Sequence, residues 1–152
     1  MPFDYSLMLC DGSADWTYAN IVSSNYGSPT SAIRNAGGLA VIDLGAADIG
    51  SAISGIAVVL ILTEAGAAAD DALTVIVEES GVVGFGSDFH ELGKFDIAAA
   101  TKGIILGNEV PATVIMRVTP RERYLRIDAS MVAGDDFGKV YCLLSPYPYK
   151  VL

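Results

Sequence analysis

The chain has 152 residues, enough for one domain with a single core, and 52% of them are apolar. Its formal net charge is −9, which argues against nucleic acid as a partner, because phosphate binding needs basic residues clustered across a face. Charged residues make up only 18% of the chain, a composition typical of a subunit whose surface is partly covered in its working state.

The first 38 residues differ from the rest in being rich in Ser, Asn, Gly and Tyr. Within them only Tyr5–Cys10 has the pattern of a strand. The remainder predicts an extended arm or long loop that lies on its own domain or on a neighbouring subunit. Aromatic rings bring a large contact area at a small cost in entropy, so they are the predicted anchors of this arm. These residues are Tyr5, Trp16, Tyr18 and Tyr26.

Residues 39–152 form the predicted body, a series of short strands separated by turns. Ile56–Thr63 is a continuous apolar run and predicts a central strand buried on both faces. Leu73–Glu79 is rich in β-branched residues and predicts another strand, followed by a loop at Val82–Ser87. Further strands are predicted at Leu39–Leu44, Glu91–Ile97, Ile104–Leu106 and Lys139–Leu144.

The segment Thr113–Ser130 predicts two more strands, joined as a hairpin by a tight turn at Thr119–Glu122. Side chains alternate with a period of two in both strands, so one face of each is predicted to meet the core. The core-facing residues are Val114, Met116 and Val118 on the first strand and Leu125, Ile127 and Ala129 on the second. Seven to eight strands without a convincing amphipathic helix predict an all-β fold, a jelly-roll-like antiparallel β-sandwich.

The same segment holds four of the five arginines of the chain, namely Arg117, Arg121, Arg123 and Arg126. A guanidinium group presents a planar fork that matches a carboxylate, so this concentration predicts a docking surface for an acidic protein neighbour. The alternative is a solvated charged face. Arg121 and Arg123, at the turn, are the best placed to reach a partner. Arg126 is expected to pair with Asp128, two residues along the same strand.

No membrane span or redox motif is predicted. The uncharged stretch between Asp48 and Glu64 has fifteen residues interrupted by Gly and Ser, whereas a spanning helix needs roughly 20 apolar residues. Cys10 and Cys142 lie in apolar runs without CxxC spacing and are expected to be reduced core cysteines. Reduced cysteines of this kind predict an intracellular product. The N-terminus also lacks the pattern of a signal peptide.

The sequence offers no catalytic constellation. His90 is the only histidine, so it is expected to be a surface residue rather than part of a triad or a metal centre. Glu78 and Glu79 are neighbours along a strand and point to opposite faces, so they do not form a carboxylate dyad. Asp70 and Asp71 are either solvated acids or a weak cation site. We therefore expect no catalytic residue, no metal and no cofactor.

Four segments appear in an order and spacing that resemble a known family. They are VIDLGAADIG (Val41–Gly50), DDALTVIVEES (Asp70–Ser80), ERYLRIDAS (Glu122–Ser130) and GKVYCLLSP (Gly138–Pro146). The chain resembles the capsid cement, or decoration, proteins of short-tailed bacteriophages, the type described for a Bordetella phage. The resemblance covers roughly residues 39–146, and the first 38 residues match it least.

The resemblance implies a non-enzymatic virion structural protein with a jelly-roll domain. It would be made in the host bacterial cytoplasm and would bind the outer surface of the phage head, joining neighbouring major capsid proteins against the pressure of the packaged DNA. The implied partners are the major capsid protein and further copies of the chain, as a homodimer or homotrimer, because closed symmetry is the common form of assembly. The alternative hypothesis is a carbohydrate-binding, lectin-like β-sandwich.

Overall fold

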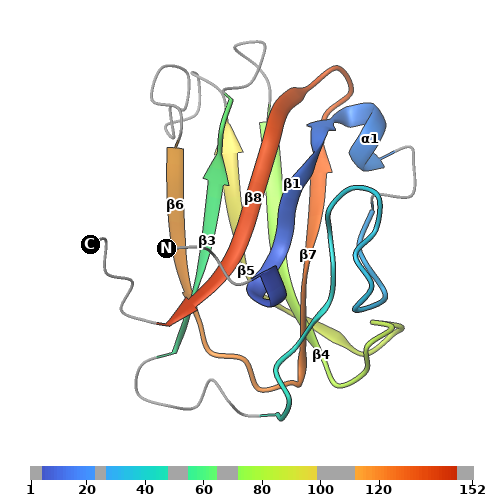
Figure 1. Cartoon of the computed structure of the whole chain (residues 1–152), viewed down its shortest axis with the longest axis vertical. Helices are drawn as coiled ribbons and strands as arrows, with labels where there is room; N and C mark the ends of the chain where they lie inside the picture. Colours follow the sequence, from blue (N-terminus) through green and yellow to red (C-terminus); the bar gives the residue numbers. More distant parts are fainter. Residues whose placement is uncertain (1–4, 23–26, 48–54, 65–71, 99–111, 147–152) are drawn as a thin grey trace.

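The structure, a computed structural model, describes residues 5–22, 27–47, 55–64, 72–98 and 112–146. It contains two four-stranded antiparallel sheets that pack face to face (Figure 1). Sheet A has the strand order β1-β8-β3-β6, and sheet B has the order β2-β7-β4-β5. The prediction of an all-β sandwich is confirmed.

The strands pair in a nested manner, the first with the last and so on inward. Sheet A consists of β1 (Met8–Thr17), β8 (Asp136–Pro146), β3 (Ile56–Leu62) and β6 (Ala112–Val118). Sheet B consists of β2 (Ile42–Asp43), β7 (Tyr124–Met131), β4 (Ala72–Ser80) and β5 (Phe89–Ala98). A short 3-10 turn, η1 (Tyr5–Leu7), precedes β1, and a five-residue helix, α1 (Tyr18–Val22), follows it.

Strand β3 lies at the centre of sheet A, between β8 and β6, as its continuous apolar run predicts. Val58, Leu60 and Leu62 belong to the main core between the sheets. Ala57 and Val59 point to the other face of the sheet, where they form a second, smaller apolar cluster with Met8 and Leu143. Both faces of β3 are therefore buried, and a continuous apolar sequence is what such a strand requires.

Most of the other predicted strands are present with shifted ends. Strand β4 is confirmed, the predicted loop at Val82–Ser87 is present, and β5 and β8 each extend beyond the predicted range at both ends. The prediction for Leu39–Leu44 is largely wrong, because only Ile42–Asp43 forms a strand. The predicted strand at Ile104–Leu106 lies outside the described residues.

The predicted hairpin at Thr113–Ser130 is wrong in its connection. Both strands exist, but β6 pairs with β3 in sheet A and β7 pairs with β4 in sheet B. The residues between them cross the end of the sandwich from one sheet to the other. Glu79 of β4 holds this crossing, because its Oε2 accepts hydrogen bonds from the backbone N–H groups of Arg121 (2.7 Å) and Glu122 (3.0 Å).

The predicted core faces of these two strands are nevertheless confirmed. Val118, Leu125 and Ile127 are buried in the main cluster. The remaining three residues of the prediction, Val114, Met116 and Ala129, are partly buried and pack against that cluster. Because the connection crosses between the sheets, the apolar faces of β6 and β7 meet the core from opposite sides. Each strand therefore shows the same alternation of apolar and polar residues that it would show in a hairpin.

The prediction of an arm or long loop after Cys10 is wrong for the residues that follow it directly. Strand β1 continues to Thr17 and pairs with β8, with register shifts along the way, and α1 follows. Residues 27–41 lie against both of the protein's own sheets: residues 38–40 bond to β1 of sheet A, and the start of the segment bonds to β7 of sheet B. The Ser28 hydroxyl donates to Asp128 Oδ1 (2.6 Å), and the Pro29 carbonyl accepts from Arg126 (3.2 Å). The chain's own domain thus supports this segment.

Candidate contact sites

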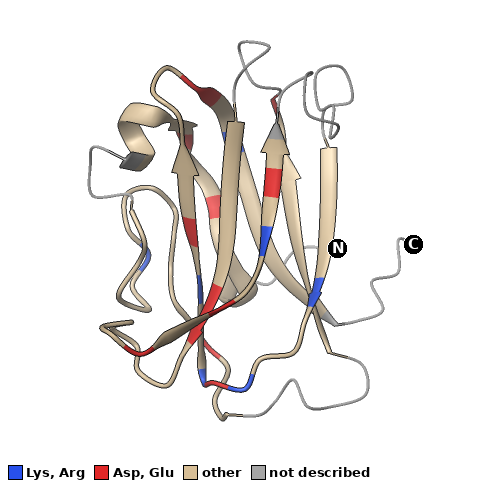
Figure 2. Cartoon of the chain, turned by 180° about the vertical axis from the view of Figure 1, so that it is seen from behind, with Lys and Arg blue, Asp and Glu red and all other residues tan. Residues whose placement is uncertain are grey.

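A polar hollow of about 650 Å³ lies where the β6–β7 connection crosses the end of the sandwich. Its walls come from the end of β4, the start of β5, the end of β6 and the connection itself. The charged or titratable lining residues are Glu79, His90, Glu91, Arg117, Arg121 and Glu122. Figure 2 shows blue and red segments side by side at this lower end of the molecule. The hollow therefore mixes both signs of charge.

Arg121 is the cation of the hollow that is available to a partner. Its backbone N–H is held by Glu79, whereas its side chain is exposed and makes no hydrogen bond or ion pair with any described residue. Arg117 lines the same hollow and lies beside Gly55, where a side chain at position 55 would collide with its guanidinium. The structure thus brings two of the four predicted arginines together.

Arg123 is already paired within the chain. Its Nε and Nη2 atoms each lie 2.8 Å from an oxygen of Asp43, which joins the end of β2 to the start of β7. The Arg123 guanidinium holds the pKa of Asp43 down to about 2, and the carboxylate raises the pKa of Arg123 in turn. About half of the Arg123 side chain remains exposed. A partner would have to compete with Asp43 for this arginine.

Arg126 is a structural residue, and the prediction that Asp128 pairs with it is wrong. Its Nε donates to Glu78 Oε2 at 2.7 Å, directly across the β7–β4 pair. The guanidinium also packs over the rings of Phe85 (4.3 Å to the ring centroid) and Phe89 (5.3 Å). Asp128 instead accepts the hydroxyl of Ser28. The partner of Arg126 therefore lies on the neighbouring strand β4 and not on its own strand.

The predicted aromatic anchors do not form one exposed set. Trp16 is fully buried in the main core, so its prediction as a contact residue is wrong. The reason is that β1 extends through it and turns it inward between the sheets. Tyr18 is partly buried against the same core. Tyr26 lies outside the described residues.

Tyr5 is the exposed aromatic residue among the described members of this group, with 59% of its surface accessible. It is also held in place. Its hydroxyl donates to Asp11 Oδ2 at 3.1 Å, and its ring lies 4.5 Å from the guanidinium of Arg34. The same guanidinium donates to the Met8 carbonyl. A rigid exposed ring loses little entropy when a partner covers it, so Tyr5 stays a candidate contact residue.

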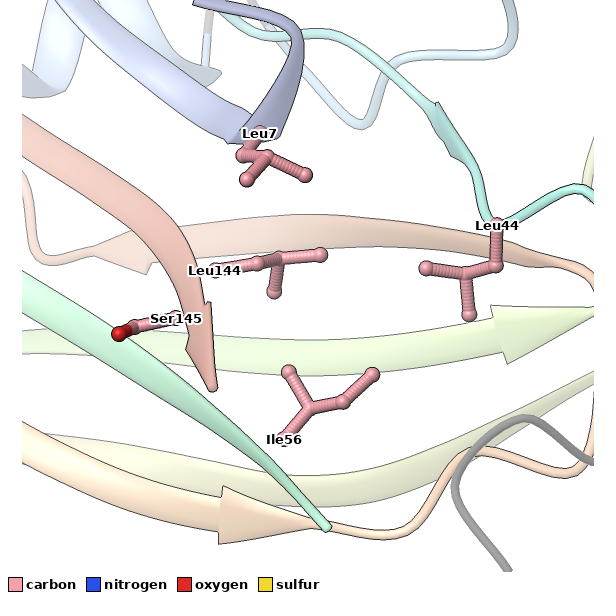
Figure 3. Close-up of a pocket in the computed structure, with 5 residues that line it drawn as sticks. All are labelled: Leu7, Leu44, Ile56, Leu144 and Ser145. Atoms are coloured by element: carbon pink, nitrogen blue, oxygen red, sulfur yellow. The ribbon is translucent and has the colours of Figure 1, made fainter. Parts of the chain in front are cut away.

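An apolar pocket of about 210 Å³ lies near η1, and sequence reasoning did not find it. Leu7, Leu44, Ile56 and Leu144 surround it, with Ser145 to one side (Figure 3). They come from separate parts of the chain, so no local sequence pattern marks the pocket. Pockets for small ligands usually have about 300–1,000 Å³, which makes this one suited to a single apolar side chain.

The described residues contain no group of three or more His, Cys, Asp or Glu residues arranged to hold a metal ion. His90 is exposed on β5, as predicted for a surface histidine. The Asp70–Asp71 pair lies outside the described residues. Within the part of the chain that the structure describes, no helix has the length and apolar character needed to cross a membrane.

Cys10 and Cys142 are free and buried, as predicted. They are Cα partners across β1 and β8, and the Cys10 thiol donates to the Val140 carbonyl at 3.1 Å. Burial raises the pKa of Cys10 to about 11 and that of Cys142 well above its ordinary value. Both thiols are therefore protonated and unreactive near neutral pH.

Searches for related proteins gave no match: no protein-family model matches the chain, and no curated protein matches its sequence.

Proposed function

We propose that the chain is a non-enzymatic capsid cement protein that binds the major capsid protein on the outside of a phage head. The observation that carries the proposal is the exposed Arg121 side chain, which has no partner among the described residues and stands at the rim of a polar hollow on a rigid sandwich. A surface carboxylate of the capsid protein would pair with this guanidinium.

The segments that resemble the cement family support the proposal through their positions. Val41–Gly50 contains β2, Asp70–Ser80 contains β4 and Glu122–Ser130 contains most of β7. These three strands are hydrogen-bonded neighbours in sheet B. Three of the four segments that resemble the family therefore lie side by side in one sheet, and the fourth, Gly138–Pro146, forms most of β8 in sheet A. The nested strand pairing is also the arrangement expected for a jelly roll, the fold that we propose for this sandwich.

Other features suit a protein that is locked into an assembly. The apolar pocket near η1 would receive one side chain of a neighbour, and Tyr5, two residues before the pocket residue Leu7, offers an exposed ring. Each contact is small, but many copies on one shell would bind with avidity. The lectin-like alternative stays a prediction that a glycan array would test.

The proposal is tested by analysing virions of the phage that encodes the chain. Purified particles are expected to contain the protein in many copies. An antibody against the chain should label intact heads, because the proposed position is on the outer surface. Particles that lack the chain, or that expose it only after disruption of the head, would overturn the proposal.

A further inference from the structure

Strand β6 is an open edge of sheet A. The sheet order places β3 on one side of it, and no described strand pairs with its other side. An edge strand presents a row of free N–H and C=O groups that can pair with another chain. Natural proteins usually protect such an edge by charged residues, proline, bulges, short length or a covering segment.

The other three edges of the sandwich carry such protection. Strand β1 has three register shifts, and it is covered in part by a bridge between Cys10 and Leu39. Strand β2 has two residues. Strand β5 has a register shift and carries charged residues along its length, among them Lys94 and Asp96.

Strand β6 has none of these devices within its seven residues. It pairs with β3 without a register shift, contains no proline and carries a single charge, Arg117. Ile115, at its middle, is 42% exposed, which is high for a large apolar residue in a sheet. A regular and apolar edge strand of this kind can pair readily with a strand of another chain.

The sequence of β6 is compatible with pairing to itself. An antiparallel pair with its two-fold axis at Ile115 places Ile115 opposite its counterpart in the second copy. Thr113 of each copy then lies opposite Arg117 of the other, so no like charges face one another. An isologous contact of this type is complete with two copies.

Strand β5, which lies beside β6, offers charges that suit the same two-fold axis. Gly93 of β5 approaches the sulfur of Met116 so closely that a side chain at position 93 would collide with it. The two edges enclose a groove of about 260 Å³ whose lining includes Lys94, Asp96 and Ile115. Lys94 and Asp96 are both more than half exposed, and they form an ion pair within the chain with Nζ and Oδ2 3.0 Å apart. A two-fold axis that passes level with Phe95, between these two residues, would also bring each Lys94 toward the Asp96 of the second copy.

We propose that β6 pairs in antiparallel orientation with β6 of a second copy, joining the two A sheets into one eight-stranded sheet. The inference deepens the self-association part of the proposed function, because it selects a dimer over a trimer and names the interface. It does not depend on the capsid role. An edge contact of seven residues per copy is smaller than a standard stable interface, so a weak dimer that dissociates on dilution is expected.

The test is sedimentation equilibrium of the full chain over a range of protein concentrations. The expected mass rises from 15.9 kDa toward twice that value as the concentration increases. Ile115→Lys should keep the chain monomeric, because it places two lysines opposite each other. Ile33→Lys is the matched control, because Ile33 is 82% exposed and lies on the 27–41 segment, so the variant should dimerise like the wild type.

A charge exchange provides a second measurement that does not depend on β6 itself. Lys94→Asp should weaken the dimer, and the double variant Lys94→Asp with Asp96→Lys should restore it, since the exchanged pair is again self-complementary. Circular dichroism confirms that each variant is folded. A wild-type monomer at all concentrations, a trimer, or a dimer of unchanged affinity in a folded Ile115→Lys variant would overturn the proposal. If Ile115→Lys fails to fold, the charge exchange decides: a double variant, Lys94→Asp with Asp96→Lys, that does not restore the dimer would overturn the proposal.

Discussion

Arg126 and Glu78 form a buried ion pair directly across strands β7 and β4, with Nε and Oε2 2.7 Å apart and each residue 6% exposed. The Pro29 carbonyl and the rings of Phe85 and Phe89 complete the surroundings of the guanidinium. The pair thus joins the two central strands of sheet B to residues 27–41 and to the β4–β5 loop. Phe85 adopts a positive φ of 48°, a conformation that costs energy in a bulky residue and that this packing must stabilise.

Removal of one partner of this pair is expected to destabilise the protein strongly. Arg126→Leu leaves the Glu78 carboxylate buried without compensation, which should cost about 3–5 kcal/mol of unfolding free energy. The double variant Arg126→Leu with Glu78→Leu removes both charges and should cost much less than the sum of the single changes. Urea unfolding of the four proteins measures this coupling. Additive costs would show that the pair contributes no specific interaction.

Glu79 should stabilise the connection between the two sheets. Glu79→Ala leaves the N–H groups of Arg121 and Glu122 without their acceptor and is expected to cost about 1–3 kcal/mol. Glu79→Gln retains an oxygen acceptor and should cost less. Glu91→Gln is the control, since Glu91 lines the same hollow but is exposed. Equal stability of Glu79→Ala and Glu91→Gln in urea unfolding would contradict the assigned role.

The buried thiol of Cys10 should make stability fall at high pH. Its pKa is raised from 9.0 to about 11, mainly by burial, so the unfolded chain loses this proton more readily than the folded one. The raised pKa adds roughly 3 kcal/mol to the unfolding free energy. This stabilisation is present in full below pH 9 and is lost as the pH rises through about 11. Cys10→Ala should therefore flatten the decline of unfolding free energy above pH 9. Identical pH profiles of variant and wild type would refute this assignment.

The exposed pair of Asp43 and Arg123 should be visible in a titration. Arg123 lowers the pKa of Asp43 from 3.8 to about 2. The ion pair therefore stabilises the folded state above pH 3.8, and this stabilisation is lost as the pH falls through about 2. Arg123→Gln is expected to return the pKa of Asp43 toward 3.8. Lys139→Gln is the control, because Lys139 lies on β8 and not at β2 or β7. An NMR titration of the Asp43 carboxyl carbon that is the same in all three proteins would contradict the ion pair.

The sequence predicted the strands of this protein better than their connections. The apolar run of β3 and the β-branched run of β4 each predict one element, because burial of β3 on both faces demands apolar residues along its length and β-branched residues favour strands. The alternation in β6 and β7 shows which face of each strand meets the core. It does not show whether the two strands share a sheet, because a hairpin and a crossing connection bury the same faces.

The roles of individual side chains were harder to predict for a similar reason. Trp16 follows a Gly-containing stretch that resembles a loop, yet the irregular β1 continues through it into the core. The partner of Arg126 is determined by the register of β7 against β4. The sequence of either strand alone does not predict how two strands distant in the chain pair. Arg121 was predicted correctly as an exposed residue near the connection, because its position there follows from local sequence.

The most direct test of the proposed function is binding to phage heads assembled from the major capsid protein without this chain. Purified protein is added in increasing amounts at low salt, and the bound fraction is measured by co-sedimentation. We expect saturable binding, an affinity reduced roughly tenfold by Arg121→Glu, or about 1.4 kcal/mol, and no change for Lys139→Glu, which alters the net charge equally at the other end of the sandwich. Absence of wild-type binding would contradict the cement function, and equal binding by Arg121→Glu would contradict the assigned contact.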